Sequence, residues 1–122
     1  MKDEGKAQDL RSRTKKYSLR IIKLYNALPS GNVARVIGKQ MLRSGTSVGA
    51  NYREAFRARS DAEFLAKLGI CLQELDETAY WLELLEEAEI IKPELLRDLH
   101  NETDQLLAIF TTISKSKKAK RS

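Results

Sequence analysis

The chain has 122 residues, of which 42% are hydrophobic and 32% are charged. This length suits one domain with a modest core and argues against a multidomain enzyme. Two prolines and six glycines are few for the many turns of an all-β fold. The net charge of +5 is unevenly spread: residues 1–60 hold 14 basic and 4 acidic residues, residues 61–113 hold 3 and 13, and residues 114–122 hold 5 and none.

Neither the cysteine content nor the N-terminus indicates export. Cys71 is the only cysteine, so no internal disulfide can form, and it lies in an apolar run typical of a buried thiol. The first residues lack the apolar stretch of a signal peptide, and the longest uncharged run, residues 24–34, is too short to span a bilayer. We expect a cytoplasmic protein without a membrane partner.

The first predicted helix ends near Ala27. Its inner stripe has spacings of three and four residues, at Leu10, Thr14, Tyr17, Ile21, Leu24 and Leu28. Leu28 precedes a proline and is followed by turn-forming residues, which end the helix. Asn32 is expected to cap the next helix. Residues 1–12 precede the predicted domain, and we expect them to form a flexible arm.

The second predicted helix, residues 33–59, has an unusual centre. Its inner stripe comprises Val33, Ile37, Met41, Ser44, Val48, Asn51 and Ala55. The small residues from Gly45 to Gly49 each cost about 0.5–1 kcal/mol of helix propensity. We predict one helix that is kinked there, closely packed at its glycines, with Ser or Thr bonded to the preceding turn. Two helices with a break near Gly45 are the alternative.

Ser60 and Glu63 have the spacing of a capping box and predict the start of the third helix. Its inner stripe is Phe64, Leu68, Cys71, Leu75, Thr78, Leu82 and Leu85. Pro93 suits the first turn of a fourth helix, whose stripe is Leu96, Leu99, Thr103, Leu106, Phe110 and Ile113. Residues 114–122 are basic without apolar content, which predicts a disordered tail.

Four amphipathic helices with short connections predict an all-α, antiparallel up-down-up-down four-helix bundle over residues 13–113. The turn near Ser60 sets the register of the second and third helices, so that positions whose numbers add up to about 120 lie level. Arg43 is therefore expected beside Glu77, and Ser47 beside Glu74.

The residues do not form a recognisable catalytic set. A di-iron bundle site needs Glu-x-x-His pairs, whereas the only histidine, His100, follows Arg97 at that spacing. Nothing brings His100 and Cys71 together as base and nucleophile. Glu74 and Glu77 lie one turn apart, but salt-bridged acids are the commoner meaning of such a pair. We expect no enzyme activity, no cofactor and no metal.

Basic residues cluster on helix faces and in the tail. Such arrays suit phosphate groups, whereas pairing with the acidic third and fourth helices is the competing interpretation for any single cation. The tail favours anion binding because it has no acidic neighbour in the sequence. The candidate nucleic-acid-binding residues are Lys16, Arg20, Lys23, Arg35, Lys39, Arg53, Arg57, Lys117, Lys118, Lys120 and Arg121.

Three segments resemble the 23S rRNA intervening sequence proteins, a family also called four-helix bundle proteins. They are residues 40–55, with Arg-Ser, Thr-Ser and Ala-Asn pairs and a Glu, then Ser60-x-x-Glu-Phe, then residues 73–82, Gln-Glu-Leu-Asp-Glu-Thr-Ala-Tyr-Trp-Leu. The resemblance covers residues 13–113. It implies a bacterial bundle that assembles as a homopentameric ring, with genes found inside inserts of large-subunit ribosomal RNA genes and elsewhere.

A distantly similar group, the accessory variability proteins of diversity-generating retroelements, is pentameric and basic, and binds nucleic acid and a reverse transcriptase. The signature polar residues carried over by motif are Arg43, Ser47, Asn51, Glu54 and Glu77. We interpret them as a structural polar layer between the second and third helices, with mutual hydrogen bonds.

Two functions fit these observations. The leading hypothesis is a non-enzymatic homo-oligomer, pentameric by the resemblance, that binds nucleic acid and in particular RNA. Its basic surface and tail would contact phosphates with low sequence specificity, because no base-reading module is present. The alternative is a protein–protein assembly or adaptor scaffold, in which the uneven charge serves subunit packing or a partner such as a reverse transcriptase.

Overall fold

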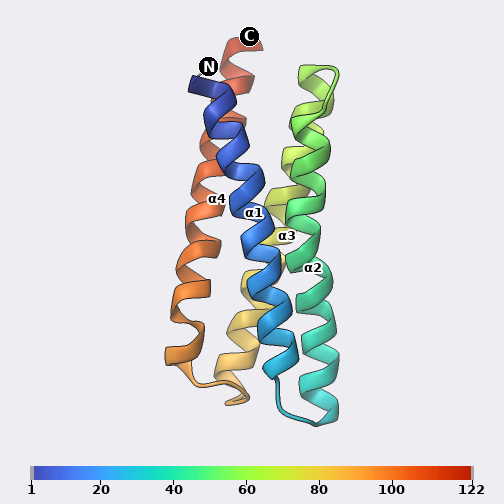
Figure 1. The fold of residues 1–122 in the computed structure, drawn as a ribbon, viewed down its shortest axis with the longest axis vertical. Helices are drawn as coiled ribbons and strands as arrows, with labels where there is room; N and C mark the ends of the chain where they lie inside the picture. Colours follow the sequence, from blue (N-terminus) through green and yellow to red (C-terminus); the bar gives the residue numbers. More distant parts are fainter. Residues whose placement is uncertain (1, 122) are drawn as a thin grey trace.

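The computed structural model describes the backbone of residues 2–121 and the side chains of residues 9–120. It contains α1 (Lys2–Ala27), α2 (Asn32–Phe56), α3 (Asp61–Glu87) and α4 (Pro93–Arg121). Successive helices run in opposite directions, so both termini and the α2–α3 turn lie at one end of a long bundle (Figure 1). The predicted all-α four-helix bundle is confirmed.

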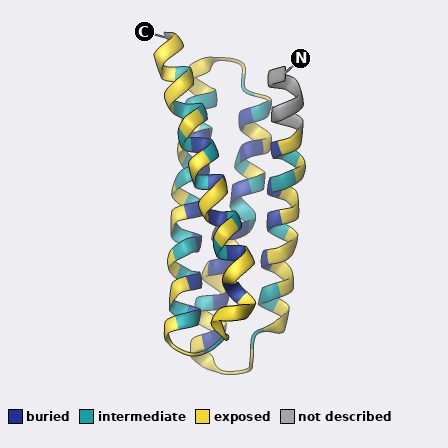
Figure 2. Ribbon diagram, turned by 90° about the vertical axis from the view of Figure 1, so that its left-hand side faces the viewer, coloured by how far each residue is buried: buried dark blue, intermediate teal, exposed yellow. Residues whose placement is uncertain are grey.

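The core lies along the bundle axis, where buried residues of all four helices face one another and exposed residues face outward (Figure 2). The predicted stripes of α3 and α4 are buried, with half-buried Phe64 and Ile113 at their ends. On α2 the predicted stripe is only partly correct. Val33 is 59% exposed. It lies two steps of four residues before Met41, and at 3.6 residues per turn these steps rotate its side chain by about 80° around the helix axis, away from Met41.

The turns are stabilised by specific caps. The Ser60 hydroxyl accepts a hydrogen bond from the Glu63 N–H at 3.1 Å, and the Glu63 carboxylate accepts one from the Arg59 N–H at 3.2 Å. The capping box is therefore confirmed, with Arg59 as the second donor. The expected Asn32 cap is wrong, because Gly31 takes that position with a φ of 137°, a conformation that glycine adopts easily.

The centre of α2 is a single continuous helix, so the alternative of a break near Gly45 is wrong. A Cβ on Gly45 would lie 2.7 Å from Ile21 Cγ1, which shows that glycine permits close packing of α1 on α2. The Thr46 hydroxyl donates to the Leu42 carbonyl at 2.7 Å, the predicted bond to the preceding turn. The kink between Gly45 and Gly49 stays a prediction.

Both ends of the chain differ from expectation. Residues 2–12, expected to be a flexible arm, continue α1, and residues 114–121, expected to be a disordered tail, continue α4. Lysine, arginine and alanine favour helix, and here they extend helices that packing has already nucleated. Lys117 also contacts α3: its Nζ lies 3.1 Å from Asp61 Oδ1 and 5.5 Å from the centre of the Phe64 ring.

Candidate nucleic-acid interface

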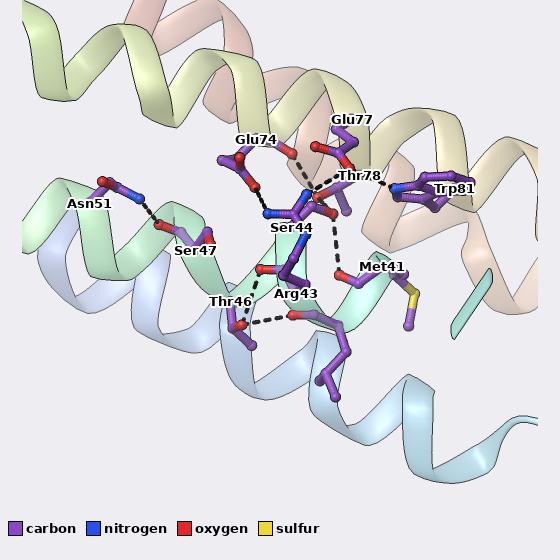
Figure 3. A network of polar contacts seen from close by, with 11 residues as sticks. Met41, Arg43, Ser44, Thr46, Ser47, Asn51, Glu74, Glu77, Thr78 and Trp81 are labelled. Atoms are coloured by element: carbon purple, nitrogen blue, oxygen red, sulfur yellow. Dashed lines mark hydrogen bonds and ion pairs between the residues drawn. The ribbon is translucent and has the colours of Figure 1, made fainter. Parts of the chain in front are cut away.

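The polar seam between α2 and α3 is centred on Arg43. Its guanidinium donates to Glu77 Oε1 at 2.6 Å and to Glu74 Oε2 at 3.1 Å, and Trp81 Nε1 donates to the same Glu77 oxygen at 3.3 Å (Figure 3). The predicted register of α2 and α3 is therefore confirmed. We call Arg43, Glu74 and Glu77 the α2–α3 seam.

These contacts fix the charges of the seam. The hydrogen bond from Arg43 lowers the pKa of Glu77, and the same bond raises the pKa of Arg43. Both groups are therefore charged at neutral pH. Because the Arg43 side chain is 52% exposed, solvent screens the pair, and it aligns the helices more than it stabilises them.

The other signature polar residues lie on α2 with different partners. Asn51 donates to the Ser47 carbonyl at 2.9 Å, a bond within α2. Glu54 lies 3.4 Å from Lys67 Nζ of α3 and is exposed. Of the signature polar residues on α2, only Arg43 and Glu54 therefore contact α3 in the described structure. The polar layer expected between α2 and α3 contains fewer mutual hydrogen bonds than the motif suggests.

A buried layer of hydroxyl groups, one from each helix, was not predicted. The Tyr17 hydroxyl of α1 lies 2.7 Å from the Thr103 hydroxyl of α4, and the Ser44 hydroxyl of α2 lies 2.7 Å from the Thr78 hydroxyl of α3. Burial raises the pKa of Tyr17 to about 12, against the smaller effect of the Thr103 hydrogen bond. The sequence places all four on inner stripes, but residue type alone does not identify their partners.

Some cations are bound within the bundle. Arg13 of α1 donates to both carboxylate oxygens of Glu102 of α4, at 2.8 and 2.7 Å, and to Gln105 at 2.7 Å. The Glu102 hydrogen bond raises the pKa of Arg13. Arg43, Lys67 and Lys117 also have carboxylate partners. Pairing of the basic α1 and α2 with the acidic α3 and α4 therefore accounts for two cations, Arg13 and Arg43.

Most of the candidate nucleic-acid-binding residues lie outside these pairs. No ion pair among the described side chains involves exposed Lys16, Arg20, Lys23, Arg35, Lys39, Arg53, Arg57 or Lys120. Lys118 is also exposed, whereas Lys117 is paired with Asp61, and the Arg121 side chain lies outside the described ones. Phosphate groups could reach the first eight of these residues without breaking an ion pair among the described side chains.

The bundle does not bring these cations into one patch. Arg53, Arg57 and the α4 lysines lie toward the end that holds the termini, whereas Lys23 and Arg35 lie near the α1–α2 turn at the other end (Figure 1). Sequence reasoning missed Arg11 and Lys15, which lie beside Arg53 on the surface between α1 and α2. Their proximity depends on how α1 packs on α2, which residue spacing alone does not specify.

The side chains best suited to catalysis or metal binding, Cys71 and His100, are buried or lie close to a carboxylate. Within residues 9–120, no three His, Cys, Asp or Glu side chains are grouped so as to hold a metal ion. Burial raises the pKa of Cys71 to about 12, and its thiol donates to the Val48 carbonyl at 3.5 Å. The His100 Nε2 lies 3.5 Å from a Glu86 oxygen. In the described part of the chain, no helix is long and apolar enough to cross a bilayer.

The helix order, the paired polar seam and the exposed basic faces together define a single-domain antiparallel helical bundle with a charged surface. The chain belongs to the family described as 23S rRNA-intervening sequence protein, which matches residues 6–112. The resemblance inferred from the sequence is thereby confirmed. No curated protein matches the chain.

A solved structure supports the same assignment. It is the crystal structure of a protein with unknown function from the S23 ribosomal protein family of Bacteroides thetaiotaomicron VPI-5482. The two chains are 40% identical and superpose with a TM-score of 0.84, over 90% of this chain and 98% of that chain. The fold is therefore shared over nearly the whole length of both proteins.

Proposed function

We propose that the protein is a cytoplasmic, non-enzymatic homo-oligomer that binds RNA through phosphate contacts with low sequence specificity. The observation that supports this most is the division of its cations. Acidic residues of α3 and α4 engage Arg13, Arg43 and Lys117, and Glu54 of α2 engages Lys67, while the other exposed cations of α1 and α2 have no carboxylate partner among the described side chains. Exposed cations of this kind displace counterions when they bind a phosphate backbone.

RNA is the nucleic acid that the family description favours, since the family is named for an intervening sequence of 23S rRNA. Low specificity follows from the character of the surface. Among the large hydrophobic side chains that are exposed, Tyr80 is the aromatic one, with 53% of its surface accessible. The described surface therefore offers few aromatic rings on which bases could stack. The non-enzymatic role is supported by Cys71, whose raised pKa leaves almost no thiolate at neutral pH.

Self-association is supported by apolar side chains on the outer surface. They are Leu19, Ile22, Val33, Val36 and Leu95, which are 39–71% exposed, together with Tyr80. A second copy could cover them, with the basic α1–α2 half of one subunit facing the acidic α3–α4 half of the next. A pentamer, the state that the family resemblance implies, would multiply the +5 charge of each chain.

The experiment that tests RNA binding is a titration of labelled structured RNA, read by fluorescence anisotropy, over a series of salt concentrations. We expect the logarithm of the affinity to fall linearly with the logarithm of salt, with a slope of several units for several phosphate contacts. Affinity that does not change with salt, or no binding at low salt, would contradict the proposal.

The second candidate function is an assembly scaffold, favoured by the same exposed apolar residues. Charge reversal at Arg20 and Lys23 separates the two functions, because both are exposed without a described ion pair. Multi-angle light scattering gives the oligomeric state and anisotropy gives RNA affinity. Weaker RNA binding by an intact oligomer supports RNA binding, whereas loss of the oligomer supports the scaffold.

A further inference from the structure

A groove of about 520 Å³ lies on the surface between α1 and α2, and three cations line it. Arg11 and Lys15 come from α1, one turn apart, and Arg53 comes from α2. None of the three has an ion-pair partner in the part of the chain whose side chains are described. None of the described side chains that line the groove is a carboxylate. We call this feature the α1–α2 groove.

The described acidic residues nearest in sequence, Asp9 and Glu54, do not line the groove. Glu54, which follows Arg53, lies 3.4 Å from Lys67 on the α3 side of α2. Asp9, which precedes Arg11, acts on the other side of α1, where its charge helps to raise the pKa of Arg13. Among the described side chains, no carboxylate therefore compensates the positive charge of the groove, which makes the groove attractive to an anion.

Arg11 is held in place without losing its hydrogen-bonding capacity. Its guanidinium lies over the Phe56 ring, 4.5 Å from the ring centre. A cation–π contact of this kind uses the face of the guanidinium and leaves its N–H groups at the edge. Those N–H groups can donate to two oxygens of one phosphate, and the ring reduces the freedom that Arg11 loses on binding.

The floor of the groove has room for a bulky ligand. It is formed by Gly49 and Ala50 of α2, beside the hydroxyls of Ser12 and Ser18 of α1. A Cβ on Gly49 would lie 3.3 Å from both Ser18 Oγ and the Thr14 carbonyl, so the two helices approach closely here. Short side chains between long cationic ones leave a channel in which phosphate oxygens can reach donors on both helices.

We propose that the α1–α2 groove binds the phosphodiester backbone of an RNA strand, with Arg11, Lys15 and Arg53 as the phosphate-binding residues. This inference rests on the proposed function and adds to it a definite site. Groups on both sides of the groove would contact successive phosphates, and no aromatic side chain that could stack on a base is among the described residues that line it. The site would therefore position the strand without reading its sequence.

The first test fills the groove without changing its charge. Ala50→Leu places a branched side chain on the exposed floor, and Ala108→Leu places the same side chain on the exposed surface of α4 as a control. With labelled single-stranded RNA, we expect Ala50→Leu to weaken binding about five-fold or more. A change of this size corresponds to the net contribution of one hydrogen bond between the protein and a phosphate group. Ala108→Leu should bind like the wild type. Circular dichroism checks that both variants are helical.

The second test removes charge. K15Q/R53Q takes one lysine and one arginine from the groove, and K92Q/R97Q takes the same pair of residue types from exposed positions near the α3–α4 turn. The groove variant should lower the salt slope by about 1.4, since each phosphate contact of a single strand contributes about 0.7. The control should leave the slope unchanged. This test also holds if Ala50→Leu perturbs folding.

The outcomes separate the groove from the proposed function. If the wild type does not bind RNA at low salt, the proposed function fails and the groove with it. If the wild type binds but each groove variant matches its control, the groove assignment is overturned while RNA binding stands. Polyglutamate that binds with the same salt slope, and with the same loss in Ala50→Leu, would overturn the assignment to phosphate and indicate an acidic protein partner.

Discussion

The two flanks of α2 present similar residues in opposite states. On the flank toward α3, Arg43 is neutralised by Glu74 and Glu77. On the flank toward α1, Arg53 lies with Arg11 and Lys15 in a groove whose described lining contains no carboxylate. The same helix therefore pairs one arginine within the bundle and leaves another, in our proposal, to bind a phosphate group.

This difference shows that net charge does not reveal which cations are paired within a bundle of this kind. The residue count gives the first half of the chain a strong positive charge, yet Arg13 and Arg43 of that half form ion pairs with carboxylates of the acidic second half. In our proposal, a cation binds RNA where no carboxylate lies within reach of it. We predict the following effects on the packing that places the two flanks, from the largest to the smallest.

The largest effect is expected in the core beneath the α2–α3 seam. Leu75 is completely buried, so Leu75→Ala removes apolar contacts and leaves a cavity, which should lower the free energy of unfolding by about 2–5 kcal/mol. Leu95 is 71% exposed, so Leu95→Ala should change it by less than about 0.5 kcal/mol. Urea unfolding followed by circular dichroism measures both. Equal losses would contradict the placement of α3 in the core.

The hydroxyl layer is the next largest contribution. Tyr17→Phe removes a buried hydroxyl that lies 2.7 Å from the Thr103 hydroxyl, and should cost about 1–2 kcal/mol because Thr103 loses this partner. Tyr80 is 53% exposed, so Tyr80→Phe should be nearly neutral. Thermal unfolding of the two variants compares them directly. A neutral Tyr17→Phe would show that the hydroxyl contact does not stabilise the bundle.

The packing of α1 on α2 predicts opposite effects at two glycines. Gly45→Ala places a methyl group 2.7 Å from Ile21 Cγ1, and the resulting strain should outweigh the gain in helix propensity, for a net loss of about 1 kcal/mol. A Cβ on Gly69 of α3 would meet nothing within 4 Å, so Gly69→Ala should stabilise the protein by about 0.5–1 kcal/mol. Stabilisation by both variants, measured by denaturant unfolding, would contradict the close approach of α1 and α2.

The smallest effect on stability belongs to the seam itself. Arg43→Gln should cost about 0.5 kcal/mol near neutral pH, since the side chain is half-exposed. Because Arg43 lowers the pKa of Glu77, this stabilisation is complete above the unfolded-state pKa of about 4.3 and is lost as the pH falls through the folded-state pKa. The variant should therefore lose less stability than the wild type on acidification. An identical acid profile for both proteins would argue against the pair.

The sequence predicts the helices well where apolar residues dominate. The stripes of α3 and α4 repeat regularly, and a regular apolar repeat leaves only one face to bury. The α2 stripe is partly wrong because glycines are buried there, and a glycine carries no side chain from which burial could be inferred. The helical end of α4 was missed because composition alone does not include the Lys117 contacts with Asp61 and Phe64.

The candidate site is harder to predict for a related reason. Spacing places Lys16, Arg20 and Lys23 on one face of α1, but it does not show which cations lack a carboxylate across the helix interface. The groove combines Arg11 and Lys15 with Arg53, residues about forty positions apart. Their proximity follows from the close approach at Gly49, which is a property of packing.

The most direct test of the distinction between the two flanks is the RNA affinity of Arg53→Gln beside that of Arg43→Gln, measured by anisotropy with one labelled RNA at one low salt concentration. Each variant removes one arginine charge from the same helix. We predict that Arg53→Gln weakens binding about five-fold or more while Arg43→Gln leaves it near the wild-type value. Equal losses, or a larger loss for Arg43→Gln, would contradict it.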